Sequence, residues 1–242
     1  MIVIPMAGMS SRFFKAGYTL PKYQLEAHGK TLFEHAVGSF EHYFDSLPFL
    51  FIVRDALGTP AFVEQMAKKI GIKQYHLVTL ENETRGQAET VTEGLKNLDS
   101  YQGPITIFNI DTFRPGFVLP DHTKSCDGYL EVFQGSGDNW SFVLPENKQT
   151  TKITETAEKR AISDLCCTGL YHFHNAKDYL EAYQHYLERP ELWEKGELYV
   201  APLYNHLIKK GKNIHYHQIS REDVIFCGVP SEYEEFKRKP LK

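Results

Sequence analysis

Met1–Arg12, with the sequence MIVIPMAGMSSR, decides the fold class of this 242-residue chain. The segment begins with a continuous apolar run, Met1–Ala7, which is typical of a strand buried on both faces of a parallel sheet. A glycine follows at once, and a basic residue stands four positions later. A tight turn that contains glycine after a first strand presents backbone N–H groups to a ligand, as phosphate-binding loops do. No basic segment precedes the apolar run, so we do not interpret it as a signal peptide.

The composition is that of an ordinary globular protein, with 42% hydrophobic and 13% aromatic residues. Lys and Arg number 27 against 31 Asp and Glu, a net charge of −4, which argues against a nucleic-acid partner because such proteins carry a basic excess. The longest apolar runs fall short of the roughly 20 residues of a membrane span. Four cysteines without a C-x-x-C pair favour a reduced, cytoplasmic environment.

Strand-like and helix-like segments alternate through the first half of the chain. The expected strands after the first are Phe49–Val53, Tyr75–Leu80 and Pro104–Ile110. The expected helices are Thr31–Tyr43, a segment that begins near Pro60, and Gly86–Leu98. This alternation predicts an α/β fold in which helices cover both faces of a mostly parallel sheet.

The second half contains shorter strand candidates and three helices. The strand candidates are Tyr129–Phe133, Ser141–Leu144, Lys152–Thr156, Gly169–His174, Asn213–Ile219 and Ile225–Val229. The helices are Ala176–Glu188, Leu198–Lys210, with Gly211 as its C′ residue, and Glu232–Arg238. His172 and His174 share a strand face, and we interpret them as half-buried structural residues. No linker or repeat divides the chain, so we expect a single domain over residues 1–242.

The segment Ala7–Arg12, followed by Pro21-Lys22, resembles the signature of the sugar-1-phosphate nucleotidylyltransferases, NTP transferases with a GT-A-like fold. That signature reads A-G-x-G/S-S/T-R, a spacer, and P-K, whereas a P-loop and a dinucleotide fingerprint are both absent. The resemblance implies a single-domain, three-layer α/β/α fold of Rossmann-like type with a mostly parallel mixed sheet. It also implies an NTP-binding half, residues 1–115, and an acceptor-binding half, residues 116–242.

The resemblance assigns nucleotide contacts and two catalytic cations. The implied nucleotide-binding residues are Ala7, Gly8, Met9, Ser10, Ser11, Gly86 and Gln87. Arg12 and Lys22 are implied to bind the triphosphate and to hold the leaving pyrophosphate. Transfer at the α-phosphate needs positive charge fixed on that leaving group, which agrees with these roles. Without the resemblance, Gly86 is equally well explained as a plain helix start.

Asp111 is the expected ligand of a Mg²⁺ cofactor. The sequence places it at the end of the fourth strand, in Asn109-Ile110-Asp111, beside the expected phosphate site. Mg²⁺ takes one or two carboxylates together with phosphate oxygens. The family usually has a second metal aspartate before a G-T-P sequence, but Phe226 occupies that place here. Asp223 is nearby, although its spacing does not match that of a regular strand.

Six further residues are implied for the acceptor side of the site. Lys159 is the third catalytic cation, in a Glu-Lys pair that resembles the family's E-K motif and contacts a phosphate. The implied acceptor-binding residues are Trp140, Ser141, Glu158, Gly169 and Glu197. An alignment that puts Glu155 in place of Glu158 loses the lysine, so we prefer Glu158. Glu197 has a second interpretation, as a carboxylate that interacts with a helix dipole.

The resemblance implies that the chain transfers NMP from an NTP to a phosphorylated acceptor, a sugar 1-phosphate, giving an NDP-sugar and pyrophosphate. The products of such enzymes enter capsule or lipopolysaccharide biosynthesis. Two other enzymes stay open: a cytidylyltransferase that acts on a non-sugar phosphate such as a phosphocholine-like acceptor, and a GT-A glycosyltransferase that uses a nucleotide sugar. A non-catalytic binding module of the same fold is a further alternative. The sequence leaves a homo-oligomer open.

Overall fold

A computed structural model describes residues 1–98 and 101–240, which form two compact units. The first unit comprises Met1–Val3, Glu83–Phe108 and Leu119–Arg221. The second unit comprises Ile4–Asn82, Asn109–Val118 and Glu222–Lys242. Strand β1 (Ile2–Pro5) begins in the first unit and ends in the second. Each unit therefore draws on both halves of the sequence.

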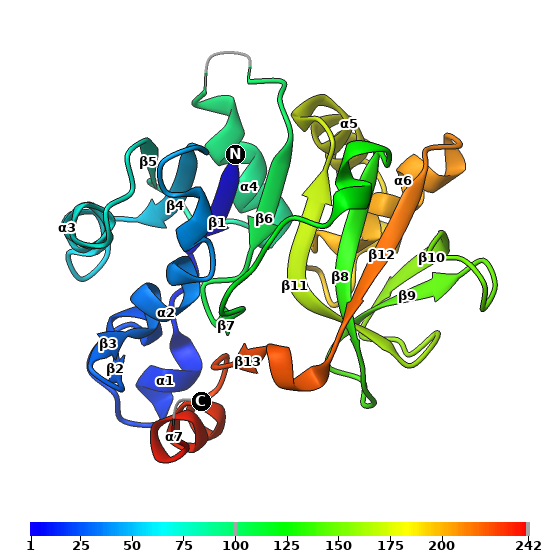
Figure 1. Cartoon of the computed structure of the whole chain (residues 1–242). Helices are drawn as coiled ribbons and strands as arrows, with labels where there is room; N and C mark the ends of the chain where they lie inside the picture. The colour runs from blue at the N-terminus through cyan, green and yellow to red at the C-terminus, as the bar shows by residue number, and fades with distance from the viewer. Residues whose placement is uncertain (99–100, 241–242) are drawn as a thin grey trace. The chain divides into compact units, whose positions relative to one another are not determined.

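The first unit is built on a mixed sheet with the strand order β10-β9-β11-β6-β1. Strand β8 pairs with β11 on one side and with β12 on the other, as Figure 1 shows. The pairs β1–β6 and β8–β12 are parallel, whereas β11 is antiparallel to β6, β8 and β9. The strands are β6 (Ile105–Phe108), β8 (Gly128–Gln134), β9 (Ser141–Pro145), β10 (Ile153–Glu158), β11 (Leu165–Phe173) and β12 (Ile214–Ile219).

Helices α4 (Gln87–Lys96), α5 (Ala176–Leu187) and α6 (Tyr204–Lys209) belong to the same unit. Helix α5 begins where it does because the side chain of Asn175 accepts a hydrogen bond from the backbone N–H of Asp178. The buried hydroxyl of Tyr179 donates to the backbone carbonyl of Ala88 at 2.6 Å and so joins α5 to α4. Short 3₁₀ turns complete the unit: Asp121–Lys124, Pro190–Leu192, Ala201–Leu203 and Arg221–Asp223, the last of which extends into the second unit.

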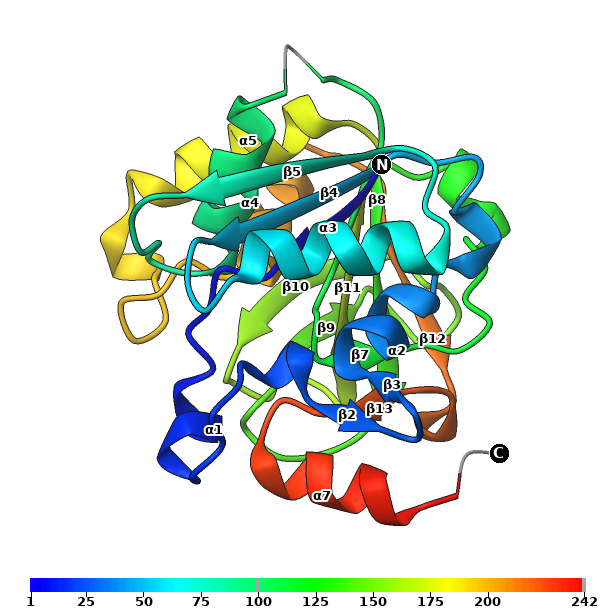
Figure 2. The same ribbon diagram turned by 90° about the vertical axis from the view of Figure 1, so that its left-hand side faces the viewer.

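The second unit contains the end of β1 and the parallel pair β4 (Phe49–Arg54) and β5 (Tyr75–Leu80). Helix α3 (Thr59–Ile70) lies across one face of these strands (Figure 2). Two small antiparallel sheets are formed by β2 (Glu26–Ala27) with β3 (Lys30–Thr31), and by β7 (Thr112–Phe113) with β13 (Ile225–Phe226). The other helical elements are α1 (Ser11–Lys15), α2 (Leu32–Gly38), α7 (Pro230–Arg238) and the 3₁₀ turns Lys22–Gln24 and Glu41–Tyr43.

Local sequence signals account for the ends of several elements. Thr31 and Glu34 form a capping box at the start of α2, in which the Glu34 N–H donates to the threonine hydroxyl and the Thr31 N–H donates to the carboxylate. Gly71 ends α3 in the left-handed conformation, with φ of +88°. Gly211 follows α6 in the same way, with φ of +79°, as the sequence predicted.

The structure confirms the predicted α/β fold with a mixed sheet and corrects three local predictions. Strand β6 ends at Phe108, so Asp111 lies in the turn that leads to β7 and not at the strand's end. The helix expected over Leu198–Lys210 begins only at Tyr204, because backbone groups of Leu198 bond to another segment. His174 lies beyond the end of β11, and His172 is buried rather than half-buried.

No helix in the described part of the chain is both long enough and apolar enough to cross a membrane.

His172 makes the stability of the first unit depend on pH. Its Nδ1 is 2.9 Å from the Thr106 hydroxyl, and its ring stacks on that of Tyr129. Burial is the main reason that the His172 pKa falls to about 3. The folded pKa is thus below the unfolded value, so the stabilisation by neutral His172 is complete above pH 6.5 and lost as the pH falls toward 3.

We therefore predict that the advantage of wild type over His172→Gln in unfolding free energy shrinks from pH 8 to pH 4.5. Below pH 6.5 this difference in unfolding free energy falls by about 1.4 kcal/mol for each pH unit. Denaturant unfolding across this pH range measures it, with His76→Gln, an exposed position on β5, as the control. An advantage over His172→Gln that does not change with pH would contradict the burial of neutral His172.

Candidate active site

The predicted phosphate loop lies in the second unit and is tied to the Pro21-Lys22 segment. Ala7 is buried two residues beyond the end of β1, whereas Gly8 and Met9 are exposed. Ser10 adopts a left-handed conformation, with φ of +51°, immediately before Ser11 begins α1. The Ser10 hydroxyl accepts a hydrogen bond from the backbone N–H of Lys22 at 3.1 Å. The structure therefore brings together two parts of the sequence motif that are twelve residues apart.

Lys22 also forms an ion pair with Asp111. Its Nζ is 2.5 Å from Asp111 Oδ2, and the two side chains are 21% and 22% exposed. Pro21 precedes the 3₁₀ turn that contains Lys22, and Asp111 lies in the turn before β7. The predicted pyrophosphate-binding cation and the predicted metal-binding carboxylate are thus in direct contact. A partly exposed carboxylate at this place accommodates a cation.

The C-terminal segment completes the surroundings of Asp111. Phe226 pairs with Thr112 in the β13–β7 ladder, and the N–H of Cys227 donates to the backbone carbonyl of Asp111 at 2.8 Å. A Cβ atom added to Gly228 would lie 3.1 Å from Asp111 Oδ2. The space beside this carboxylate is therefore open because residue 228 has no side chain.

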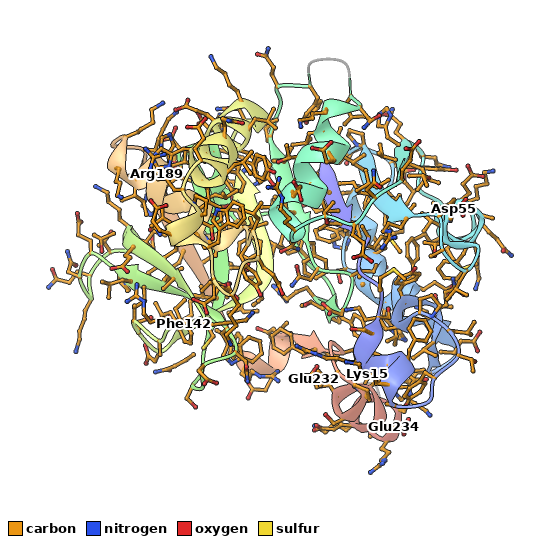
Figure 3. All side chains as sticks on the ribbon, turned by 180° about the vertical axis from the view of Figure 1, so that it is seen from behind. Lys15, Asp55, Phe142, Arg189, Glu232 and Glu234 are labelled. Carbon is orange, nitrogen blue, oxygen red and sulfur yellow. The ribbon has the colours of Figure 1, made fainter. Side chains whose placement is uncertain are left out.

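Glu232, on the first turn of α7 and labelled in Figure 3, is a second carboxylate in this region. Its Oε2 accepts hydrogen bonds from the backbone N–H groups of Gly228, at 2.8 Å, and Val229, at 3.2 Å. The same oxygen would be 3.6 Å from a Cβ at position 228. Burial is the main reason that the pKa of the Cys227 thiol is raised, and Glu232 and Asp111 act in the same direction.

These surroundings fit a divalent cation held by oxygen atoms. Among residues 1–98 and 101–240, no group of three or more His, Cys, Asp or Glu side chains has the arrangement of a metal site. A site of this kind takes most of its ligands from water and from phosphate oxygens, as Mg²⁺ does. The open space beside Asp111 leaves room for such ligands.

Arg12, the other predicted cation of the second unit, is exposed on α1. The neighbouring Phe13 is buried and packs edge-on against Tyr18, with ring centroids 5.5 Å apart, which anchors this short helix. Arg12 forms no ion pair within the described residues, in contrast to Lys22.

In the first unit, Gly86 is explained by a close backbone contact. Its φ is +146°, and an added Cβ would lie 2.5 Å from the carbonyl oxygen of Leu198. Leu198 bonds to the residues on both sides of this glycine: its N–H donates to the Arg85 carbonyl, and its carbonyl accepts from the Ala88 N–H. Gly86 thus joins α4, whose first residue is Gln87, to the segment that contains Glu197.

Predicted acceptor residues meet at the edge of the same unit's sheet. Ser141 on β9 pairs with Glu158 on β10, and the serine hydroxyl donates to the Glu158 carboxylate. The Ser141 hydroxyl is also 3.3 Å from the hydroxyl of Tyr171 on β11. Burial raises the pKa of Glu158, although Ser141 and Lys159 act in the opposite direction. Trp140, directly before Ser141, packs edge-on against Phe133.

Lys159 follows Glu158 in a left-handed conformation, with φ of +52°. Its ammonium group donates a hydrogen bond to the Tyr199 hydroxyl and lies 4.3 Å from the centre of that ring. Gly169 is buried in β11, where the register with β8 shifts and its φ is +96°. Glu197 is exposed and forms a β-bridge with Glu194.

Comparison with solved structures identifies the family. A structure of the nucleoside-diphosphate-sugar pyrophosphorylase from Vibrio cholerae RC9 is 66% identical in sequence, with a TM-score of 0.97 over 99% of this chain and 100% of that one. The chain belongs to the nucleoside-diphosphate-sugar pyrophosphorylase family. It is therefore a nucleotidyltransferase, and the predicted resemblance is confirmed.

More distant members of the fold include the inositol-1-phosphate CTP transferase from T. maritima, with 16% identity and a TM-score of 0.69 over 100% of this chain and 97% of that one. A UDP-glucose pyrophosphorylase complexed with UDP-glucose has 16% identity and a TM-score of 0.73 over 98% of this chain and 96% of that one. No protein-family model and no curated protein matches the chain.

Sequence patterns assign no role in the site to three residues of this pyrophosphorylase family member: Tyr199, Gly228 and Glu232. Their positions depend on contacts with Lys159 and Asp111, which are distant in sequence. The one local signal was alternation: Leu198 and Val200 are buried, so Tyr199 lies on the other face.

Replacement of Gly86 by alanine tests the backbone contact. We predict that Gly86→Ala lowers the thermal unfolding temperature, with a cost on the order of 1–3 kcal/mol, because the new Cβ meets backbone atoms of Leu198 and the φ value disfavours a side chain. Gly38→Ala is the matched control, since its Cβ meets nothing within 4 Å and its φ is ordinary. Equal unfolding temperatures for the two variants would contradict the contact.

Proposed function

We propose that this enzyme transfers NMP from an NTP to a sugar 1-phosphate, giving an NDP-sugar and pyrophosphate. An oxygen of the acceptor phosphate forms the new bond to the α-phosphorus, and the bond between that phosphorus and the bridging oxygen to the β-phosphate breaks. Because the attacking phosphate is already ionised at neutral pH, no general base is needed. Catalysis then consists of positioning the two substrates and stabilising charge.

The observation that carries this proposal is the contact of Lys22 with Asp111 beside the glycine loop. In the reaction Lys22 turns to the leaving pyrophosphate, which gains negative charge as the α–β bond breaks. Arg12, exposed on the next helix, contributes the second positive charge. Residues Ala7–Ser11 present backbone N–H and hydroxyl groups to the phosphates.

Asp111 is the residue that would hold Mg²⁺, with Gly228 keeping the space beside its carboxylate open. When bound, this ion neutralises phosphate charge and polarises the α-phosphate. The incoming phosphates would offer the Lys22 ammonium group a new partner, which would leave both oxygens of the Asp111 carboxylate available to the ion. Phe226 places no carboxylate here, so Asp111 is the single carboxylate that we assign to the ion.

The first unit supplies the base and acceptor contacts in this proposal. Gly86 and Gln87, at the start of α4, contact the nucleobase. Lys159 binds phosphate, while Trp140, Ser141, Glu158, Gly169 and Glu197 form the acceptor side. We further propose that residues 1–242 act as one nucleotidyltransferase domain.

We also propose that the enzyme works in the cytoplasm and that its product enters capsule or lipopolysaccharide synthesis. All four cysteines are free and buried, which supports a reducing environment. The cytoplasm is also where the NTP substrate is available.

Pyrophosphate release in the presence of Mg²⁺ tests the proposed function. Four NTPs are assayed against a panel of sugar 1-phosphates, with phosphocholine as the non-sugar acceptor. We expect release that requires one NTP together with one sugar 1-phosphate. Release with an NTP and phosphocholine, but with no sugar 1-phosphate, would favour the cytidylyltransferase alternative. Nucleotide binding by thermal shift without release from any pair would contradict the proposal.

The roles of the second unit's charged residues are tested by substitution. We predict that Lys22→Ala and Asp111→Asn each lower kcat on the order of 100-fold or more, because each removes charge stabilisation from the transferred or leaving phosphate. Lys15→Ala, an exposed lysine on α1 labelled in Figure 3, and Asp223→Asn, in the turn before β13, serve as controls with mild effects. Circular dichroism checks the fold, and equal losses in all four variants would refute these assignments.

A further inference from the structure

Lys159 and Tyr199 make a contact that the family signature does not explain. The lysine ammonium donates to the tyrosine hydroxyl and also lies over the ring, 4.3 Å from its centre. Both side chains are partly exposed, so the pair is no part of the hydrophobic core. A cation over an aromatic ring at an exposed site contributes little to stability, on the order of 0.5–1 kcal/mol. The contact instead affects geometry, because it restricts the long, flexible side chain of Lys159.

Tyr199 is held in place from both sides along the chain. Leu198 and Val200 are buried, which directs the residue between them away from the core. The backbone of Leu198 is bonded to Arg85 and Ala88, at 2.8 and 2.9 Å, across the closely packed Gly86. The tyrosine therefore extends from a segment that is fixed to the start of α4.

The backbone of Lys159 is equally well defined. Its N–H donates to the carbonyl of Trp140 at 2.9 Å, which extends the β9–β10 ladder by one residue beyond the Glu158–Ser141 pair. Its left-handed conformation is unfavourable for a residue with a side chain. Strain of this kind persists where the surrounding structure fixes the residue, and it gathers at functional sites. The side chain alone has freedom to move, and Tyr199 limits it.

The Tyr199 hydroxyl serves Lys159 as a hydrogen-bond acceptor. Burial is the main reason that the pKa of this hydroxyl is raised, and the nearby Glu197 acts in the same direction. The hydroxyl therefore stays neutral beside the lysine ammonium group.

We propose that Tyr199 is a positioning residue that holds Lys159 in the arrangement that binds the acceptor. This inference rests on the proposed function, since it takes Lys159 as a phosphate ligand. The lysine side chain has high rotamer entropy, and a side chain restrained before binding loses less of it when the acceptor arrives. The restraint on Lys159 should therefore strengthen binding of the acceptor and leave binding of the NTP unchanged.

Steady-state kinetics of three variants test the proposal. Tyr199→Leu removes both ring and hydroxyl. We expect it to raise the KM for the acceptor about tenfold, which lowers the rate at subsaturating acceptor correspondingly. The KM for the NTP should stay unchanged within about twofold. Tyr199→Phe keeps the ring and is expected to lie between wild type and Tyr199→Leu. Tyr216→Leu, on β12 in the same unit, is the control with wild-type constants.

A spectroscopic measurement reports on the contact without catalysis. Reductive ¹³C-methylation keeps the positive charge of lysine, and the signal of Lys159 is assigned by its loss in Lys159→Arg. The ring of Tyr199 should shift that signal upfield in wild type and in Tyr199→Phe but not in Tyr199→Leu, whereas Tyr216→Leu leaves it unchanged.

The outcomes distinguish a failure of the role of Tyr199 from a failure of the proposed function. A Lys159 signal without an upfield shift in wild type, or equal acceptor KM values for wild type and Tyr199→Leu, would overturn the role of Tyr199. Absence of turnover by wild type with every acceptor counts against the proposed function, and it is seen before any variant is made. A uniform rise in both KM values together with a lower unfolding temperature would show a merely structural role.

Discussion

The ion pair between Lys22 and Asp111 is the interaction on which the site of the second unit depends. It joins the segment after the glycine loop, through the bond from Lys22 N–H to the Ser10 hydroxyl, to the turn before β7. The backbone carbonyl of Asp111 in turn accepts from Cys227, which brings the C-terminal segment to the same place. Each charge compensates the other in this pair. In the function proposed above, the pair is where the phosphates and the metal ion would bind.

In the first unit, a close backbone contact joins distant segments, as the ion pair does in the second unit. Leu198 crosses Gly86 so closely that any side chain at position 86 would collide with it. This contact is the physical reason for the glycine, which the sequence alone explained equally well as a helix start. It also fixes Tyr199, and through that residue Lys159. The two units therefore use different means, charge pairing in one and close backbone approach in the other, to place a lysine to which we assign a catalytic role.

The sequence predicted the fold class because β1, β4 and β6 are continuous apolar runs, almost all of whose residues are buried. Tyr75–Leu80 was predicted with the bounds that β5 has in the structure. Local patterns failed where distant segments decide the conformation. A helix was expected from Leu198, yet the backbone of Leu198 bonds to Arg85 and Ala88, and the α-helix begins only at Tyr204, after a 3₁₀ turn. Likewise, no local pattern reports that Gly228 borders Asp111 or that Tyr199 contacts Lys159. The roles assigned to the site residues stay predictions, because they concern substrates.

A crystal structure with a bound NTP and Mg²⁺ tests the central claim most directly, because the claim is that Lys22 exchanges one partner for another. We expect Lys22 Nζ to have left Asp111 and to lie within hydrogen-bond distance of a phosphate oxygen, with the Asp111 carboxylate at the metal ion. A nucleotide bound while Lys22 and Asp111 stay paired at 2.5 Å, with the metal ion on other residues, would contradict the assignment of both.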